Sequence, residues 1–271
     1  MVNAMIDQKK IIEAAQMISE SQYVVAFTGA GISAESGIST YRDTGGIWDK
    51  YPEGSSGGIV SVISKHPEDA PQILMDVFRS LKEAAPNPGH KALVELEKMG
   101  YLRSVITQNI DNLHREAGNK QVLELHGNAL RLRCLECGKQ QIYEREPYFR
   151  MMTGLISQTG SFSIQEMIKL LPLCECGGHT RLDAVTFGEA VQDYAMAQKE
   201  AQACDMMLIL GTSGVVYPAA AIPDYALAKG AKLIEINPQK SPFTKNCNIF
   251  LEGKTGELLP KTIIALKNIL S

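Results

Sequence analysis

A short apolar run that ends directly in a glycine turn is the feature that most limits how this chain can fold. Residues 23–27 are rich in valine, which is typical of a buried strand, and Gly29 and Gly31 follow at once. A strand, a glycine turn and the start of a helix, in that order, open the nucleotide-binding unit of α/β proteins. Glycine lets the backbone turn tightly and lets a pyrophosphate approach its N–H groups.

The alternative to a phosphate-binding loop is that these glycines form a tight turn that binds no ligand. Their spacing differs from the G-x-G-x-x-G pattern of dinucleotide-binding proteins, and two glycines alone favour the plain turn. The polar stretch that follows contains Arg42 and the single tryptophan, Trp48. Because a plain turn would end sooner, this continuation favours a ligand-binding loop.

Apolar runs alternate with helical patterns along the rest of the chain. Helical spacing predicts helices over residues 5–20, 219–229 and 255–270. Strands are expected at Ser104–Thr107, Val122–Leu125, Met206–Leu210, Lys232–Ile236 and Asn248–Leu251. Such alternation is typical of an α/β fold with a parallel sheet that helices cover on both faces. Residues 134–176 interrupt the pattern, and we expect them to form an inserted module.

The composition is that of an ordinary globular protein. Of the 271 residues, 45% are hydrophobic and 21% are charged, which excludes a disordered chain. The net charge is −3, so there is no basic excess to neutralise nucleic-acid phosphates, and we expect no direct nucleic-acid binding. No apolar run reaches the ~20 residues of a membrane helix, and residues 1–10 lack the apolar core of a signal peptide. We therefore expect a cytoplasmic protein without membrane contact.

Two cysteine pairs begin and end the inserted module. Cys134 and Cys137 form a C-x-x-C pair, and Cys174 and Cys176 form a tighter C-x-C pair. Four thiolates in two close pairs match the ligands of a tetrahedral Zn²⁺ site. Since four protein ligands leave no position for water, the predicted metal is structural. Coincidental free cysteines are the alternative, which two pairs make improbable.

Polar side chains follow two of the expected strands at their carboxyl ends, where open α/β sheets bind ligands. Gln108, Asn109 and Asp111 follow residues 104–107, although Asp111 could simply cap the next helix. His126 follows residues 122–125, and its ordinary pKa of ~6.5 suits a general base. A buried histidine without a catalytic role is the alternative.

These motifs together resemble the sirtuins, the NAD-dependent protein deacylases. The resemblance covers residues 20–260, nearly the whole chain. The matching segments, in family order, are residues 29–33, Tyr41-Arg42, residues 107–111, His126-Gly127-Asn128, the four cysteines, Phe187-Gly188-Glu189, Gly211-Thr212-Ser213 and Ile236-Asn237.

The resemblance implies a Rossmann-type NAD-binding domain with an inserted small zinc-ribbon module. The expected boundaries are 1–130 with 180–271 for the large domain and 131–179 for the module, with helical insertions from the large domain at about 50–90. NAD would lie between them as a consumed co-substrate. The products would be nicotinamide, free lysine and an O-acyl-ADP-ribose, acetyl being the expected acyl group. The acylated lysine of a protein or peptide would bind as an extended strand.

The resemblance also implies a role for each matching residue. His126 would be the base that takes a proton from the ribose hydroxyls, and Asn109 would position ribose and water. The implied cofactor-binding residues are Gly29, Ala30, Gly31, Ser33, Glu35, Tyr41, Arg42, Gln108, Asn109, Ile110, Asp111, Gly211, Thr212, Ser213, Asn237 and Thr255. The implied substrate-binding residues are Val185, Phe187, Gly188, Glu189, Val216 and Tyr217. The implied zinc ligands are Cys134, Cys137, Cys174 and Cys176.

Acyl selectivity follows from two further positions. The desuccinylating branch of the family carries Tyr and Arg on the helix before Pro-Asn-x-Gly-His, and the matching positions here are Met75 and Phe78. Apolar residues there predict a preference for neutral acyl groups over succinyl, because an unpaired buried carboxylate is costly. The alternative is that both are core residues and that Arg79 or Lys82 supplies the charge.

Three other functions compete with deacylation. The first is mono-ADP-ribosyl transfer to protein on the same fold, although relatives with that activity often alter the loop and base motifs that look complete here. The second is a non-enzymatic module whose zinc ribbon binds a partner. An NAD oxidoreductase is the third, and the glycine spacing argues against it.

Overall fold

A parallel sheet of six strands forms the centre of the large unit. The computed structural model describes residues 2–38, 47–158 and 163–271. The strand order is β3-β2-β1-β7-β8-β9. The strands are β1 (Val24–Thr28), β2 (Leu102–Thr107), β3 (Val122–Glu124), β7 (Met206–Leu210), β8 (Lys232–Asn237) and β9 (Ile249–Glu252). β1 pairs in parallel with both β2 and β7, so the expected parallel α/β sheet is confirmed.

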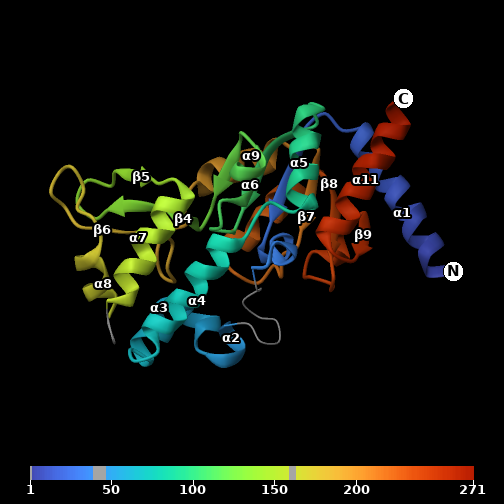
Figure 1. Ribbon diagram of the computed structural model, residues 1–271. Coiled ribbons are helices and arrows are strands. Elements are labelled where there is room, and N and C mark those ends of the chain that lie inside the picture. The colour runs from blue at the N-terminus through green and yellow to red at the C-terminus, as the bar shows by residue number, and fades with distance from the viewer. Residues whose placement is uncertain (1, 39–46, 159–162) are drawn as a thin grey trace.

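Helices cover both faces of this sheet (Figure 1). Val24 and Ala26 of β1 face the apolar layer under α1 (Val2–Ser19), α5 (Pro88–Lys98) and α11 (Thr255–Leu270). Val25 and Phe27 face the opposite layer, under α9 (Tyr194–Ala203) and α10 (Ile222–Ala228). Since alternate side chains of a strand point to opposite faces, burial on both sides explains why β1 is a continuous apolar run.

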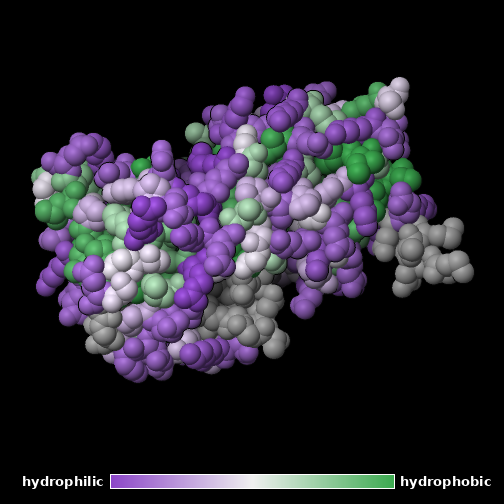
Figure 2. Space-filling model, viewed as in Figure 1, coloured by the Kyte–Doolittle hydropathy of each residue, from purple (hydrophilic) through white to green (hydrophobic). Residues whose placement is uncertain are grey.

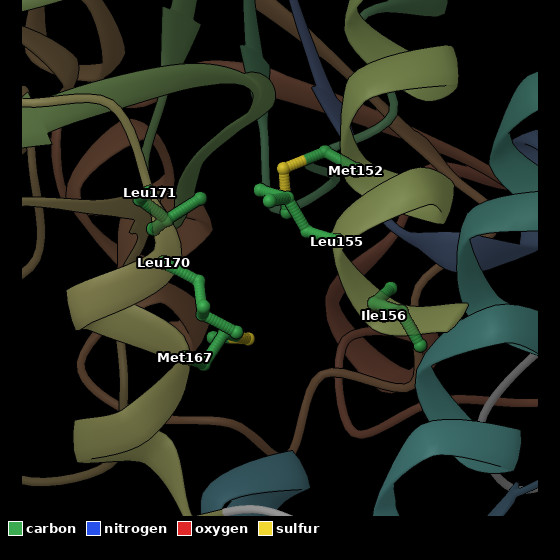
Figure 3. Close-up of a pocket in the computed structure, with 6 residues that line it drawn as sticks. All are labelled: Met152, Leu155, Ile156, Met167, Leu170 and Leu171. Atoms are coloured by element: carbon green, nitrogen blue, oxygen red, sulfur yellow. The ribbon is translucent and has the colours of Figure 1, made fainter. Parts of the chain in front are cut away.

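A second, smaller sheet lies beside the first and is antiparallel. Its strand order is β5-β4-β6, formed by β4 (Gly127–Cys134), β5 (Gln140–Ile142) and β6 (Thr180–Ala184). Two helices lie on this unit, α7 (Arg145–Ser157) and α8 (Ile164–Leu170), and a small apolar gap remains between them (Figure 3). The inserted module thus has a sheet of its own, as expected from the break in the α/β pattern.

The described residues form four further α-helices. They are α2 (Ile47–Lys50), α3 (Gly54–Lys65), α4 (Ala70–Glu83) and α6 (Leu113–Ala117). α4 packs on α7, so this helical insertion joins the apolar core of the small unit. Most of the face visible in Figure 2 is hydrophilic. Within the described residues, no helix is long and apolar enough to cross a membrane.

The helix expected directly after the glycine turn is replaced by two short 3₁₀ turns, at Ala30–Ile32 and Ala34–Ser36. Ser33 N donates to Ala30 O at 3.0 Å, a bond of the tighter 3₁₀ type. The Asn87 side chain donates to Ile32 O at 2.7 Å, which occupies a carbonyl that a continuing α-helix would use. The sequence around residues 29–36 could not predict this bond, because Asn87 lies 55 residues further along the chain.

Candidate active site

A cavity of about 850 Å³ lies at the carboxyl ends of the parallel strands, between the two sheets. It brings together most of the residues that the sequence singled out. Those that line it are Gly29, Ala30, Gly31, Glu35, Gln108, Asn109, Ile110, His126, Val185, Phe187, Gly188, Glu189, Gly211, Thr212, Ser213, Val216, Tyr217 and Asn237. Tyr41 and Arg42 lie outside the described residues.

The glycines of the first loop let two strand ends meet without side chains between them. Gly31 N donates to Gly211 O at 2.7 Å. A Cβ atom at Gly31 would lie 2.7 Å from Gly211 Cα, and one at Gly29 would lie 2.8 Å from the Thr212 Cβ. Both distances are too short for a real Cβ contact. The loop after β1 therefore packs against the loop after β7 through bare backbone, which leaves the cavity wall open to a phosphate group.

Three of the expected NAD-binding residues lie behind this wall and not on it. Ser33 donates to Asp111 Oδ2 at 2.6 Å, and both side chains are buried. Burial raises the pKa of Asp111 above its ordinary value. Asn109 donates to Ser33 Oγ and to Gly29 O, each at 3.1 Å, so the buried pair holds the Asn109 amide at the cavity. Thr255 is also buried, at the first turn of α11.

Both oxygens of Asp111 have partners within the protein, and one of them holds the start of the next helix, as the capping alternative expected. Oδ1 accepts the backbone N–H of Leu113 at 2.9 Å, the first residue of α6, while Oδ2 accepts from Ser33. Glu35 lines the cavity, but its Oε2 accepts from Gly256 N at 2.7 Å. Glu35 therefore ties the glycine loop to the start of α11.

His126 lies in the turn between β3 and β4, with its ring on the cavity. Its Nδ1 is 2.9 Å from the backbone oxygen of Gln108. A carbonyl oxygen only accepts hydrogen bonds, so Nδ1 carries the proton and Nε2 keeps its lone pair in the neutral ring. Burial lowers the pKa of His126, and the bond to Gln108 opposes this in part. The imidazole is thus neutral at pH 7 and able to accept a proton at Nε2.

The segment after β6 lies directly against this histidine. Val185 N donates to His126 O at 2.9 Å. Phe187 is 54% exposed and Tyr217 66%, so two large apolar rings face solvent at the cavity rim. Glu189 lines the same rim, but Arg181 donates to its carboxylate at 2.7 Å, and this bond lowers the Glu189 pKa although burial opposes it. Glu189 also accepts from Thr186 N at 2.9 Å, so it holds the turn that follows β6.

The cavity also has lining residues outside the predicted set of site residues. They are Ala34, Ser55, Gly57, Gly58, Ile59, Val60, Ala184, Thr186, Val191, Pro218, Pro238, Gln239, Lys240 and Lys254. Gly58 has a positive φ of 67°, and a Cβ there would lie 3.1 Å from the Phe187 ring. The cluster of glycines at 54–58 was the available signal, since a run of this kind marks a backbone that something approaches closely.

Met75 and Phe78 belong to the core of the small unit, as the alternative held. Phe78 is only 2% exposed, and its ring centroid lies 6.3 Å from that of Tyr148 and 6.0 Å from that of Phe149. Met75 packs against the same cluster. Neither is among the described residues that line the cavity.

The nearby cations do not supply a charge to the cavity either. Arg79 Nη1 pairs with Asp76 at 3.3 Å, and the Arg79 side chain is 59% exposed. Lys82 pairs with Glu146 at 3.3 Å on the surface. Both cations therefore have acidic partners outside the cavity.

The four cysteine thiols of the small unit converge on one point. Cys134 Sγ lies 3.6 Å from Cys176 Sγ, and Cys137 Sγ lies 3.7 Å from Cys174 Sγ. All four sulfur atoms lie within 4.8 Å of one another. Tetrahedral Zn²⁺ with bonds of about 2.3 Å places its sulfur ligands about 3.8 Å apart, so the cluster fits this ion. The backbone N–H groups of Cys137 and Glu136 lower the pKa of Cys134 to about 6, toward the thiolate that binds metal.

Comparison with known proteins assigns the family. The sequence profile of the Sir2 family matches residues 29–218. An NAD-dependent protein deacylase of Desulfosudis oleivorans is 45% identical over 265 residues, which cover 96% of this chain and 97% of the relative. The chain belongs to the Sir2 family. The resemblance to the sirtuins seen in the sequence is thereby confirmed.

Solved structures of this family have the same fold. A Sir2 homologue in complex with NAD has a TM-score of 0.76 at 34% identity, over 96% of this chain and 94% of that one. A Sir2 protein bound to a myristoylated histone peptide has a TM-score of 0.70 at 32% identity, over 97% of this chain and 98% of that one. The Rossmann-type sheet with an inserted small unit is therefore the family's architecture.

Replacing one zinc ligand should remove both the metal and part of the stability. We expect Cys174→Ser to lose zinc and to unfold at a lower temperature, because metal binding contributes directly to folding of a four-cysteine site. Atomic absorption and thermal unfolding measure both effects. Cys247→Ser is the matched control, since Cys247 lies outside the cluster and should leave the zinc content unchanged. A stable Cys174→Ser protein with one zinc per chain would contradict the assignment.

Proposed function

We propose that His126 and Asn109 are the catalytic residues with which this chain removes acyl groups, acetyl above all, from protein lysines. The chain is an NAD-dependent protein deacylase, as its Sir2 relatives are named, and these matches favour deacylation over mono-ADP-ribosyl transfer. The observation that carries the assignment of the base is the neutral His126, fixed at Nδ1 by Gln108. When bound, NAD supplies the reactive bond, which joins its ribose to the nicotinamide leaving group.

The base has a defined direction of proton transfer. With Nδ1–H held by Gln108 O, Nε2 is the atom that accepts a proton from a ribose hydroxyl. The charge that develops on the ring is stabilised at Nδ1 by the same carbonyl. The Gln108 side chain donates to Thr212 Oγ1 at 2.8 Å and so joins the base to the phosphate-binding end of the cavity.

Each end of the cavity suits one part of NAD. The bare backbone at Gly29, Gly31 and Gly211 would approach the pyrophosphate, and Asn109 would orient the ribose and a water molecule. Asp111, buried behind Asn109, would meet the nicotinamide carboxamide. The remaining residues that would hold NAD are Ala30, Glu35, Tyr41, Arg42, Gln108, Ile110, Thr212, Ser213 and Asn237, while Ser33 and Thr255, which are buried behind the wall, would support it from there.

The acylated peptide would bind as an extended strand between two segments. Val185, Phe187, Gly188 and Glu189 would lie on one side and residues 216–217 on the other, since both segments line the cavity. The rings of Phe187 and Tyr217 support the proposal, because they expose apolar surface that a bound peptide would bury. Strand addition uses the peptide backbone and therefore accepts many sequences.

We further propose the division of the chain into residues 1–130 with 180–271 as the NAD-binding unit and 131–179 as the zinc-binding unit. The helical insertion at about 50–90 packs on the zinc-binding unit, and the contact of α4 with α7 supports this. One Zn²⁺ per chain would be held by the four cysteines as a structural ion. A cytoplasmic location would keep these thiols reduced.

The direct test of this function uses one acetylated peptide, NAD and mass spectrometry. Wild-type protein should release nicotinamide and O-acetyl-ADP-ribose in equal amounts, and His126→Ala should lower kcat by roughly 10²-fold or more through loss of the base. His179→Ala is the control, because His179 is exposed and lies outside the cavity. Label from NAD that stays on protein would instead support ADP-ribosyl transfer, and near-normal turnover of His126→Ala would refute its role.

The pH dependence should report the lowered pKa of the base. Burial lowers the pKa of His126 below 6.5, so its neutral form persists from neutral pH into the mildly acidic range. We expect kcat/KM to fall on acidification as the ring becomes protonated, with its half-maximal point below pH 6.5. A half-maximal point above 6.5 would show that another group limits the rate. The profile is measured with saturating peptide and varied NAD.

We still expect neutral acyl groups to be preferred over succinyl, but the residues responsible are ones that line the cavity and not Met75 and Phe78. The apolar lining near His126 includes Ile59, Ile110 and Val185, whereas the lining lysines Lys240 and Lys254 follow β8 and β9. Three strands separate β3 from β8, which places β8 about 19 Å from the end of β3. A succinyl carboxylate near His126 would thus lack a lysine partner.

Kinetics on a single peptide tests this preference. We expect kcat/KM for the acetyl and myristoyl forms to exceed that for the succinyl form by about tenfold or more, which corresponds to about 1.4 kcal/mol. The three peptides share one sequence, so only the acyl group differs. A higher kcat/KM for succinyl than for both neutral groups would overturn the prediction.

A further inference from the structure

Two buried carboxylates lie on either side of the turn that carries His126. Glu124 ends β3, two residues before His126, and its side chain is 4% exposed. Asp183 lies in β6, and its side chain is fully buried. One guanidinium contacts both: Arg131 Nη1 lies 3.0 Å from Glu124 Oε2, and Arg131 Nε lies 2.5 Å from Asp183 Oδ2. Arg131 itself is only 11% exposed.

This contact joins the two sheets, because its members come from both. Glu124 belongs to the large parallel sheet, while Arg131 in β4 and Asp183 in β6 belong to the small one. The other oxygens are also satisfied. Glu124 accepts from Asn128 Nδ2 at 2.7 Å, and Asp183 accepts from Gln192 Nε2 at 2.7 Å. Each carboxylate also has a second cation, since Arg115 Nε lies 3.1 Å from Glu124 Oε1 and Arg133 Nε lies 3.4 Å from Asp183 Oδ1. Of these three arginines, Arg131 is the one that contacts both carboxylates. A buried network bonded in this way fixes geometry, because breaking its bonds is costly.

The backbone around His126 is held to the same strand β6. Gly127 has a φ of 84°, and a Cβ there would lie 2.0 Å from Asp183 O, so the turn touches β6 without space between them. Val185 N bonds to His126 O, two residues beyond Asp183. The position of His126 relative to the segment 185–189 therefore depends on the distance between Glu124 and Asp183.

We propose that Arg131 is a positioning residue that sets this distance and thereby places His126 against the acyl-peptide segment. The proposal rests on the proposed role of His126 as base. Arginine suits the task because its planar fork presents Nη1 and Nε to two carboxylates at once, whereas a lysine ammonium is a single point charge on a flexible stem. A lysine at 131 preserves the charge and loses the bridge.

The test compares two conservative substitutions on the same strand. Arg131→Lys removes the bridge, and Arg133→Lys is the matched control, because Arg133 contacts only Asp183, at 3.4 Å, and is 30% exposed. We expect Arg131→Lys to lower kcat about tenfold or more, since small misplacement of a catalytic group is costly. The KM for NAD should stay within about twofold, because Arg131 is not among the described residues that line the cavity. Zinc content should equal that of the wild type.

The controls separate this proposal from the function on which it rests. Arg133→Lys should keep kcat within about twofold of the wild type. Wild-type kcat in Arg131→Lys would overturn the positioning role while leaving the deacylase function intact, and an inactive wild-type protein would instead refute the function. An equal loss in both variants would assign the effect to the charge around Asp183 and overturn the proposal.

A second substitution decides the matter if Arg131→Lys does not fold. Each oxygen of Glu124 accepts from a guanidinium: Oε1 from Arg115 Nε at 3.1 Å, and Oε2 from Arg131 Nη1 at 3.0 Å. Glu124→Gln keeps the shape of the side chain, but its amide nitrogen must face one of these donors and cannot accept from it. We expect a folded Glu124→Gln protein to show the same pattern of lowered kcat and unchanged KM for NAD. Wild-type kcat in that protein would overturn the proposal.

Discussion

The backbone of Gly31 lies against the backbone of Gly211, and no side chain fits between them. This contact joins the loops after β1 and β7, the two strands at the centre of the sheet. Because the strands are parallel, all their carboxyl ends open on the same edge, and the two loops form one wall of the cavity there. Two of the residues that we propose for the site are fixed to this wall: Asn109 donates to Gly29 O, and the Gln108 side chain donates to Thr212 Oγ1.

Behind the wall, the structure buries polar groups in their neutral forms. Thr28 donates to Thr107 at 2.8 Å and therefore accepts from His114 Nε2, which lies 3.0 Å away. The rings of His90 and His114 have centroids 4.8 Å apart. Burial lowers the pKa of His90 to about 4 and holds that of His114 well below its ordinary value. Two neutral rings can lie tilted against each other at an angle of 58° without charge repulsion.

The sequence predicted the sheet and most of the cavity because both follow from short-range patterns. Apolar runs placed the strands to within a residue or two, and polar residues after them pointed to the binding edge. The periodicity of a sequence does not predict which way a side chain points once the strand has ended. Ser33 and Asp111 face inward to each other, and Thr255 is buried, although all three belong to matching segments. Phe78 was misplaced for a related reason: a helix face contacts whichever unit packs on it, and α4 packs on α7.

The cavity lies between two units that have separate cores. The junction between the units must therefore be rigid if the residues around the cavity are to keep their positions. His126 lies in the turn after β3 of the large sheet, and Gly127 begins β4, the first strand of the small one. His126, the base that we propose, would be displaced by any shift of one unit against the other. Covalent continuity alone does not prevent that shift, because a single turn can rotate. The buried bridge from Glu124 through Arg131 to Asp183 spans the crossing on both sides, and it does so with charges that burial makes costly to separate. The electrostatic cost of opening the junction would therefore protect the position of His126, as we propose.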